Sequence, residues 1–244
     1  MREIGVSELF GSVEDPFVRH HMDPQHTRRA WVLGRAVIVD GTRARPRDVP
    51  AGPVFTCLGP VDDLAELMGR VSTEVPAPWR LSVEVAAYDA VPDEWRQRSH
   101  HRWHWMTTEA APYPVPSAEV LGDAAEIDAL LDIANQDSFA RPGTNGVDAW
   151  LGLRSPGGGD LVGVGAVLRM SDRTGHLRGV SVLPSARGRG LGTALSAALT
   201  AHALVDGSGV ATLGVYVDNA PAMAIYTGLG YSIAHTFASG PVRG

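Results

Sequence analysis

Residues 180–192 read Val-Ser-Val-Leu-Pro-Ser-Ala-Arg-Gly-Arg-Gly-Leu-Gly, and the interpretation of the whole chain depends on this stretch. The apolar residues before Pro184 predict a strand over 177–183, which the proline ends because it lacks an amide donor for a sheet ladder. Apolar residues then recur at helical spacing, which predicts a helix: Leu191, Ala194, Leu195, Ala198 and Leu199. The glycines at 188, 190 and 192 thus lie between a strand and a helix N-terminus.

A glycine-rich turn before a helix is suited to binding phosphate, because its backbone N–H groups and the helix dipole both favour an anion. Arg187 and Arg189 either add charge-assisted contacts to that anion or are solvated loop residues. The chain has no lysine, so the P-loop pattern is absent. Thr193 replaces the third glycine of the dinucleotide fingerprint, and no acidic residue stands at the expected place on a following strand. Nicotinamide binding is therefore not favoured.

A second motif follows at residues 217–231, which read Val-Asp-Asn-Ala-Pro-Ala-Met-Ala-Ile-Tyr-Thr-Gly-Leu-Gly-Tyr. It predicts a helix over 219–229, with Asn219 as a suitable N-cap and Gly230 as the stop. Together with Val180-x-Val182-x-Pro184 and Arg187-x-x-Gly190-x-Gly192, this motif resembles the GCN5-related N-acetyltransferase (GNAT) family over roughly residues 118–244.

The resemblance implies two parallel strands, 177–183 and 210–217, that splay apart so that the arm of acetyl-CoA lies between them. It also implies acetyl-CoA as co-substrate. Asn219 contacts the cofactor in this interpretation, caps its helix, or does both. The residues expected to bind the cofactor are Val180, Val182, Arg187, Gly188, Arg189, Gly190, Leu191, Gly192, Thr193, Asn219, Ala222 and Tyr226.

The reaction implied is direct attack of an amine on the thioester. Tyr226 matches the tyrosine that protonates the leaving thiolate; the alternative is that it packs under its helix with its hydroxyl on a backbone group. His176 stands where the family often has a glutamate, which makes it the candidate general base. A relayed water as base, or a purely structural role for this histidine, are the alternatives. Asp137, Ser138 and His235 are weaker candidates for acceptor binding.

The first half of the chain has a similar order of elements without the motifs. We expect strands over Trp31–Val39 and Val54–Leu58 and a helix over Asp62–Val71. The aspartates at 62 and 63 would repel a phosphate at that helix N-terminus. The prediction is a degenerate GNAT-like copy over 1–111, with a structural or acceptor-cleft role, a proline-rich connector over 112–117 and a catalytic domain over 118–244.

The expected fold is therefore α/β (mixed α+β), with a splayed mixed sheet flanked by helices in two GNAT-like halves. One irregularity concerns the end of the chain, because only 14 residues follow Gly230, which is room for one good strand. Either the last strand is short, or the N-terminal half or a second subunit completes the sheet edge.

Composition limits the other classes of function. The chain has 244 residues, 44% of them hydrophobic, and a net charge of −6 without a basic half, which argues against nucleic-acid binding. Cys57 is the single cysteine, and the histidines at 100, 101 and 104 would not converge on a strand, so no disulfide or metal site is expected. No apolar run or signal peptide is evident, which favours a cytoplasmic protein without a membrane partner.

The function expected is thus N-acetyl (acyl) transfer from acetyl-CoA to a primary amine of a small molecule, by a monomer or homodimer. The alternatives are a non-catalytic CoA-binding sensor or scaffold, and a structural protein with a vestigial loop.

Overall fold

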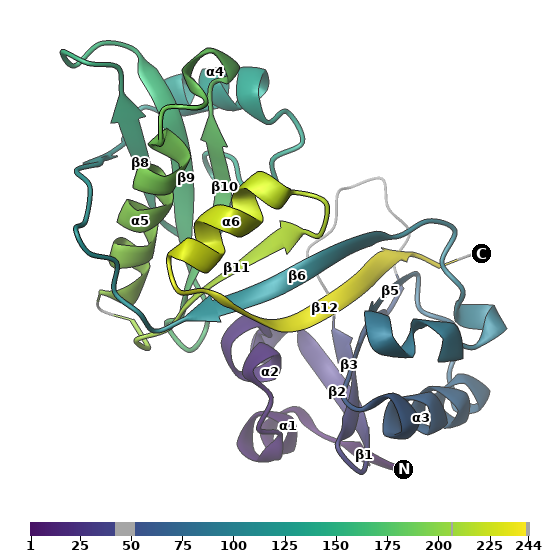
Figure 1. Cartoon of the computed structure of the whole chain (residues 1–244). Coiled ribbons are helices and arrows are strands. Elements are labelled where there is room, and N and C mark those ends of the chain that lie inside the picture. Colours follow the sequence, from purple (N-terminus) through teal and green to yellow (C-terminus); the bar gives the residue numbers. More distant parts are fainter. Residues whose placement is uncertain (42–51, 206, 243–244) are drawn as a thin grey trace. The chain divides into compact units, whose positions relative to one another are not determined.

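The computed structural model describes residues 1–41, 52–205 and 207–242 (Figure 1). The chain folds into two compact units. Unit 1 comprises Met1–His104 and Ala234–Gly244, and unit 2 comprises Trp105–Ile233. Two strands, β6 (His101–Thr108) and β12 (Ser232–Pro241), contribute residues to both units.

Unit 1 is a mixed sheet with its helices drawn from the first third of the chain. Its strands are β1 (Arg2–Ile4), β2 (Thr27–Leu33), β3 (Ala36–Gly41), β4 (Val54–Leu58) and β5 (Arg80–Glu84). Its helices are α1 (Val6–Ser12), α2 (Pro16–His21) and α3 (Val61–Glu74), with short 3-10 helices at Pro24–His26, Val85–Ala90 and Asp93–Trp95. The strand order is β1-β2-β3-β4-β5-β12.

Unit 2 is likewise a mixed sheet with helices. Its further strands are β7 (Glu119–Val120), β8 (Val147–Arg154), β9 (Leu161–Arg169), β10 (Gly175–Val182) and β11 (Ala211–Tyr216). Its helices are α4 (Ala124–Ala134), α5 (Leu191–Leu204) and α6 (Ala220–Gly228), with a 3-10 turn at Pro184–Ala186. The strand order is β6-β11-β10-β9-β8-β7.

The two units repeat one topology, as the order of elements predicted. In unit 1, β2, β3 and β4 are antiparallel, α3 follows, and β5 returns parallel to β4. In unit 2, β8, β9 and β10 are antiparallel, α5 follows, and β11 returns parallel to β10. The mixed α/β class and the two like halves are thereby confirmed.

The last strand of each copy lies in the sheet of the other copy, which corrects the predicted boundaries of 1–111 and 118–244. β6 ends the first half of the chain but borders β11 of unit 2, and residues Phe237–Pro241 of β12 pair antiparallel with β5 of unit 1. Ladder hydrogen bonds therefore set the division at 104/105 and 233/234, and the proline-rich segment 112–117 lies inside unit 2. One strand, β12, follows Gly230, and β6 from the N-terminal half supplies the sheet edge next to β11. This is one of the three alternatives considered.

A second correction concerns 31–39, which was expected to be one strand. The chain instead turns at Gly34, whose φ of +56° is readily adopted only by glycine, and forms the hairpin of β2 and β3. Asp63 of α3 fixes this turn by accepting a hydrogen bond from the Arg35 backbone N–H at 2.9 Å. The core of unit 1 lies between α3 and the sheet and includes Trp31, Phe55 and Trp95.

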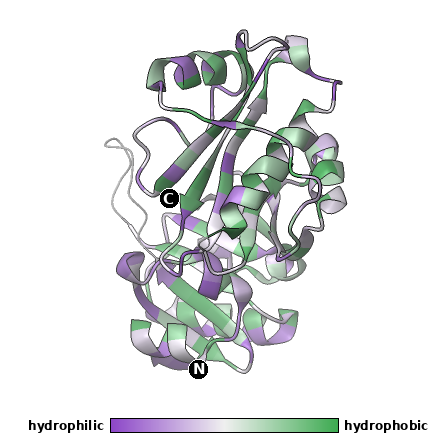
Figure 2. Ribbon diagram, turned by 90° about the vertical axis from the view of Figure 1, so that its left-hand side faces the viewer, coloured by the Kyte–Doolittle hydropathy of each residue, from purple (hydrophilic) through white to green (hydrophobic). Residues whose placement is uncertain are grey.

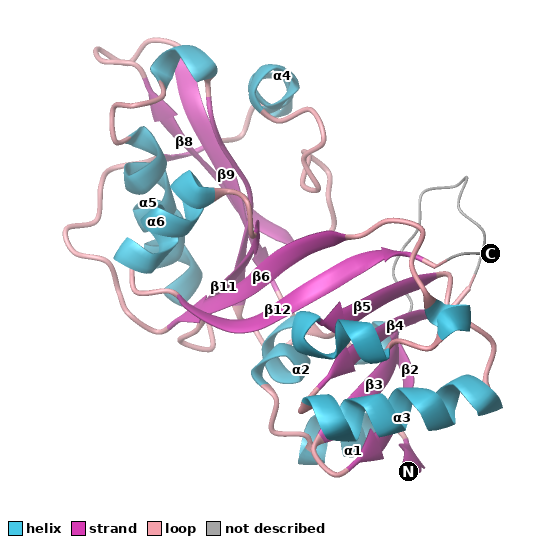
Figure 3. Ribbon diagram, turned by 45° about the vertical axis from the view of Figure 1, so that its right-hand side comes forward, coloured by secondary structure: helices cyan, strands magenta, loops and turns pink. Residues whose placement is uncertain are grey.

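Unit 2 has a sheet covered on both faces (Figure 3). Leu195 and Leu199 of α5 pack with Leu177 of β10 on one face, where α6 also lies. On the other face, α4 packs against Trp150 and Val164 of the neighbouring strands. Hydrophobic stretches recur along the strands of both units (Figure 2). Among the described helices, none is long and apolar enough to cross a membrane.

His235, a weaker acceptor-site candidate in the sequence, is part of a buried charge cluster in unit 1. Its Nδ1 contacts Glu84, and its Nε2 lies 3.3 Å from Oδ1 of Asp15, the N-cap residue of α2. Burial alone would lower the pKa of His235, but the hydrogen bonds and charges of the two carboxylates outweigh it and raise the pKa to about 9. The protonated histidine therefore links α2, β5 and β12.

This cluster makes the free energy of unfolding depend on pH. A group whose pKa is raised by folding contributes its full stability below the unfolded pKa and loses it as the pH rises through the folded pKa. When the pH rises from 6.5 to 9, we expect the free energy of unfolding of the wild type to fall by about 1–3 kcal/mol through this group. The His235→Gln variant is less stable from the start and should not show this fall. Urea unfolding at both pH values measures this difference. His101→Gln, on the exposed end of β6, is the control; equal pH dependence in wild type and His235→Gln would contradict the assignment.

Candidate active site

The central strand β10 is interrupted by a β-bulge. Its register with β9 runs from Gly175↔Arg169 to Arg178↔Ala166 and resumes one residue out of step at Ser181↔Val164. The extra residue falls at Gly179 and Val180, and Gly179 has a φ of +62°. Backbone groups at a bulge leave the ladder, so this part of β10 can offer them to a ligand.

The parallel strands β10 and β11 separate at the same place. Their register covers only Gly175↔Ala211 to Leu177↔Leu213, although β10 continues to Val182 and β11 to Tyr216, all within the described residues. The expectation of a parting between these strands is borne out by this pairing. The corresponding strands of unit 1 stay paired from Val54↔Arg80 to Cys57↔Val83, nearly to the end of β4.

The glycine loop has the geometry of an anion site. Gly188 and Gly190 have φ values of +77° and +75°, and no atom of the described residues lies within 4 Å of the place that a Cβ would take at either glycine. Gly190 is the N-cap of α5, and no described side chain caps this helix. The first N–H groups of α5 are therefore directed toward the loop without a side-chain acceptor. Leu191, Gly192 and Thr193 form this first turn, so the residues fit the pyrophosphate of a CoA-type ligand.

The two loop arginines are exposed. Arg187 Nε donates to the Val182 carbonyl at 3.2 Å, which ties the loop to the end of β10. Arg189 donates a long bond of 3.4 Å to the Ser185 carbonyl. Both guanidinium groups keep further donors, so phosphate contact remains a prediction for each.

Helix α6 begins as predicted. The Asn219 side chain caps it by accepting a hydrogen bond from the Ala222 N–H at 3.2 Å. Its role toward a cofactor remains a prediction. Ala222 is half-buried, and Ile225 approaches the position where Gly192 would carry a Cβ, at 3.2 Å, so a larger residue there would push α6 away from α5.

Tyr226 lies on the buried face of α6. Burial raises the pKa of its phenol to about 12, although a hydrogen bond with Ser196 of α5 opposes this shift. Its ring packs edge-on to Tyr231 at 5.8 Å. The catalytic interpretation of Tyr226 and its alternative, packing under its helix, both remain predictions. A phenol with this pKa keeps its proton at every physiological pH and can act as a donor.

His176 lies in β10 beside the point where the strands part. It is buried, with an exposed fraction of 4%, and its Nδ1 lies 2.8 Å from the hydroxyl of Thr212 on β11. Its role as a base stays a prediction.

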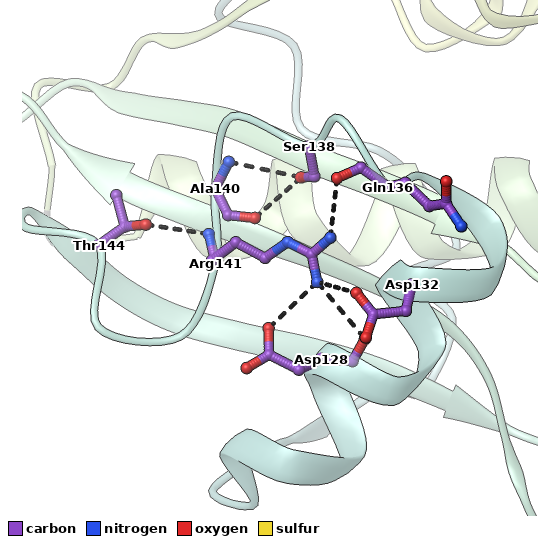
Figure 4. Close-up of polar contacts among 7 residues, drawn as sticks. All are labelled: Asp128, Asp132, Gln136, Ser138, Ala140, Arg141 and Thr144. Carbon is purple, nitrogen blue, oxygen red and sulfur yellow. Dashed lines mark hydrogen bonds and ion pairs between the residues drawn. The ribbon is translucent and has the colours of Figure 1, made fainter. Parts of the chain in front are cut away.

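The loop after α4 packs against the bulge and is fixed by Arg141 (Figure 4). Arg141 donates to Asp132 at 2.7 Å, to Asp128 at 3.3 Å and to the Gln136 carbonyl at 2.9 Å. Ser138 stands 3.0 Å from the position of a Cβ on Gly179, while Asp137 is exposed. Of the three acceptor-side candidates, Ser138 therefore lies beside the bulge, and His235 belongs to the cluster in unit 1.

The sequence analysis missed one residue here, Arg178, which is partly buried on β10 just before the bulge. An arginine among the small and apolar residues of this strand does not by itself indicate a site. The part of the chain that the structure describes has no group of three or more metal-ligating side chains placed to hold an ion.

Comparisons with known proteins point to one family. Residues 128–231 match the sequence model of the acetyltransferase (GNAT) family. A mycothiol acetyltransferase from Corynebacterium urealyticum is 40% identical over 65 residues, which are 27% of this chain and 19% of that protein. The chain thus aligns with about a fifth of the length of the curated relatives it matches.

Solved structures agree on the fold. A GCN5-related N-acetyltransferase from Kribbella flavida has a TM-score of 0.54 at 20% identity, covering 89% of this chain and 90% of that one. A GNAT-family acetyltransferase from Colwellia psychrerythraea has a TM-score of 0.55 at 15% identity, covering 96% and 93%.

Gly190 allows a direct test of the loop. Gly190→Ala places a Cβ in open space but at a φ of +75°, so we expect a loss of about 1 kcal/mol in stability and weaker acetyl-CoA binding as the loop shifts. Thermal denaturation and calorimetric titration measure the two effects. Gly69→Ala in α3 is the matched control, also in open space, and is expected to stabilise by about 0.5–1 kcal/mol without changing the affinity. Unchanged affinity in Gly190→Ala would remove the loop from the binding site.

Proposed function

We propose that this chain, a member of the GNAT acetyltransferase family through residues 128–231, transfers the acetyl group of acetyl-CoA to a primary amine of a small molecule. The observation that carries the proposal is the coincidence of three features on β10. The strand has a bulge at Gly179 and separates from β11 after Leu177. It is followed by the glycine loop, which leads into helix α5, a helix without a side-chain cap. An extended thioester with a pyrophosphate at one end matches this arrangement.

The phosphate end of the site is the N-terminus of α5. Backbone N–H groups of Gly188–Thr193 bind the pyrophosphate in this proposal, and Arg187 and Arg189 supply positive charge from the rim. The pantetheine arm then lies along Val180–Val182 and takes the place of the missing ladder with β11. Asn219 and Ala222, at the start of α6, border the arm from the other side.

The chemical step needs little covalent help from the protein. The amine nitrogen attacks the thioester carbonyl carbon, a C–N bond forms, the C–S bond breaks, and the amine proton leaves to a base or a water. In this proposal the backbone N–H of Val180, which lies within the bulge, polarises the carbonyl oxygen. Tyr226 returns a proton to the departing thiolate, and His176 receives the amine proton, directly or through water.

The names of the relatives support a small-molecule acceptor. The aligned proteins are named for the acetylation of mycothiol, which favours a small molecule over a protein substrate. In this proposal unit 1 has a structural role and does not form a second acetyl-CoA site. Its parallel strands stay paired, Pro60 is the N-cap residue of its helix α3, and Asp62 and Asp63 occupy the first turn. We expect one acetyl-CoA per chain.

Two linked measurements test the proposal. Titration calorimetry should give one acetyl-CoA per chain, and a thiol reagent should detect CoA release with an amine library. A ligand at about 100 times its Kd adds about 2.7 kcal/mol to stability, so a thermal shift with ATP and NAD as controls complements the titration. Binding without release of CoA would favour the sensor or scaffold alternative. No binding would overturn both.

Tyr226→Phe tests the proton donor. We expect kcat to fall about 100-fold while the Kd for acetyl-CoA changes less than about 3-fold, because only the transition state gains from the proton. Tyr231→Phe is the matched control. Its hydroxyl is also buried but contacts Thr200 at 2.9 Å, so it should lose about 1 kcal/mol of stability and keep its kcat. Equal kcat values in the two variants would exclude Tyr226 as the acid.

A further inference from the structure

Arg178 occupies a defined place in the site. Side chains alternate along a strand, so Arg178 shares a face of β10 with His176, while Leu177 faces α5 and packs with Leu195. Ala166, the residue opposite Arg178 on β9, belongs to the hydrophobic cluster of α4, so Arg178 lies on the face of the sheet that α4 covers. A Cβ on the next residue, Gly179, would meet Ser138 at 3.0 Å. Arg178 thus lies on the α4 side of β10, just before the bulge.

Among the described residues, the guanidinium of Arg178 has no counter-ion. Its side chain has neither a hydrogen-bond nor an ion-pair partner in that part of the chain. The other arginines that face inward in unit 2 have carboxylates: Arg141 with Asp132, Arg154 with Glu126, and Arg169 with Asp148. Burial lowers the pKa of Arg178, but an arginine remains charged in proteins. An unpaired charge in such a place is costly and favours an anionic ligand.

The surroundings fit a small polar ligand. Beyond Leu177, β10 has no ladder partner on the β11 side among the described residues, so the thioester of the proposed reaction lies next to this segment. Asn135, the C-cap residue of α4, reaches the same strand and donates to the Ser181 hydroxyl at 3.3 Å. Ser138 adds a further hydroxyl on this side of the bulge. The α4 face therefore combines one cation with neutral polar groups close to the expected site of attack.

We propose that Arg178 binds the carboxylate of the acceptor, so that the substrate is a small molecule carrying both a primary amine and a carboxylate, such as an amino acid. The inference rests on the proposed acetyl transfer. The planar fork of arginine matches a carboxylate through two parallel hydrogen bonds, which fixes both the position and the orientation of the ligand. With the carboxylate held at Arg178, an α-amine is directed toward the bulge of β10. A purely cationic polyamine would be repelled.

The test uses the full chain and a panel of matched amines: free amino acids, their carboxamides and spermidine. For at least one amino acid, wild-type kcat/KM should exceed that for its carboxamide by about 10- to 150-fold, the usual effect of one hydrogen-bonded charge. In Arg178→Gln, kcat/KM for the acid should fall by the same factor, mainly through KM, while that for the amide stays within about 3-fold. Arg178→Lys should be intermediate, because it keeps the charge without the fork. Arg70→Gln, on the exposed face of α3, is the control.

The outcomes distinguish failure of the carboxylate site at Arg178 from failure of the proposed acetyl transfer. If carboxamides or spermidine are acetylated as well as the free acids, the carboxylate site is overturned while acetyl transfer stands. An equal loss for acid and amide in Arg178→Gln, with an unchanged melting temperature, would also overturn it. If no amine in the panel releases CoA, the proposed function itself fails, and the carboxylate site fails with it.

Discussion

The separation of β10 and β11 after Leu177 is the constraint on which the site depends. A parallel ladder that continued to Val182 would satisfy its own backbone groups and leave nothing to bind an extended ligand. The bulge at Gly179 starts the separation, because the extra residue shifts the register with β9 and turns the strand. The face of the sheet that packs on α5 is hydrophobic. The separation of the strands therefore removes ladder hydrogen bonds but leaves the hydrophobic core closed.

Unit 1 shows what the same topology does without that separation. Its β4–β5 ladder continues to Cys57↔Val83, and the loop after it contains Pro60 where unit 2 has glycine. Asp63 there fixes the Gly34 turn of its own sheet. In the proposed function only unit 2 binds a ligand, which agrees with glycine at the start of its helix and with proline and aspartates at the start of the corresponding helix in unit 1. The strands β6 and β12 each contribute residues to both units.

Much of unit 2 could be predicted because its signals are local. Strand, glycine loop, helix and the Asn219 cap each follow from residues within one or two turns, and the parting of β10 and β11 followed from the family resemblance. The exchange of β6 and β12 could not be predicted, because strand order depends on partners more than 100 residues apart. The hairpin at Gly34 was hidden in a continuous apolar run. Arg178 was missed for another reason: its significance is the absence of a partner among the described residues, which no local pattern encodes.

The charges near β10 fit the order of events in the proposed reaction. An acceptor amine must lose its proton before it can attack, and a fixed positive charge nearby lowers the pKa of an ammonium group. Arg178 therefore favours the reactive, neutral form of the amine as well as the carboxylate beside it. In the proposed reaction Tyr226 acts on the sulfur side of the same thioester, since burial keeps the proton on its phenol until a thiolate forms beside it. Exclusion of solvent thus favours the proposed roles of both residues. It strengthens the electrostatic field of the Arg178 cation and keeps the Tyr226 phenol protonated.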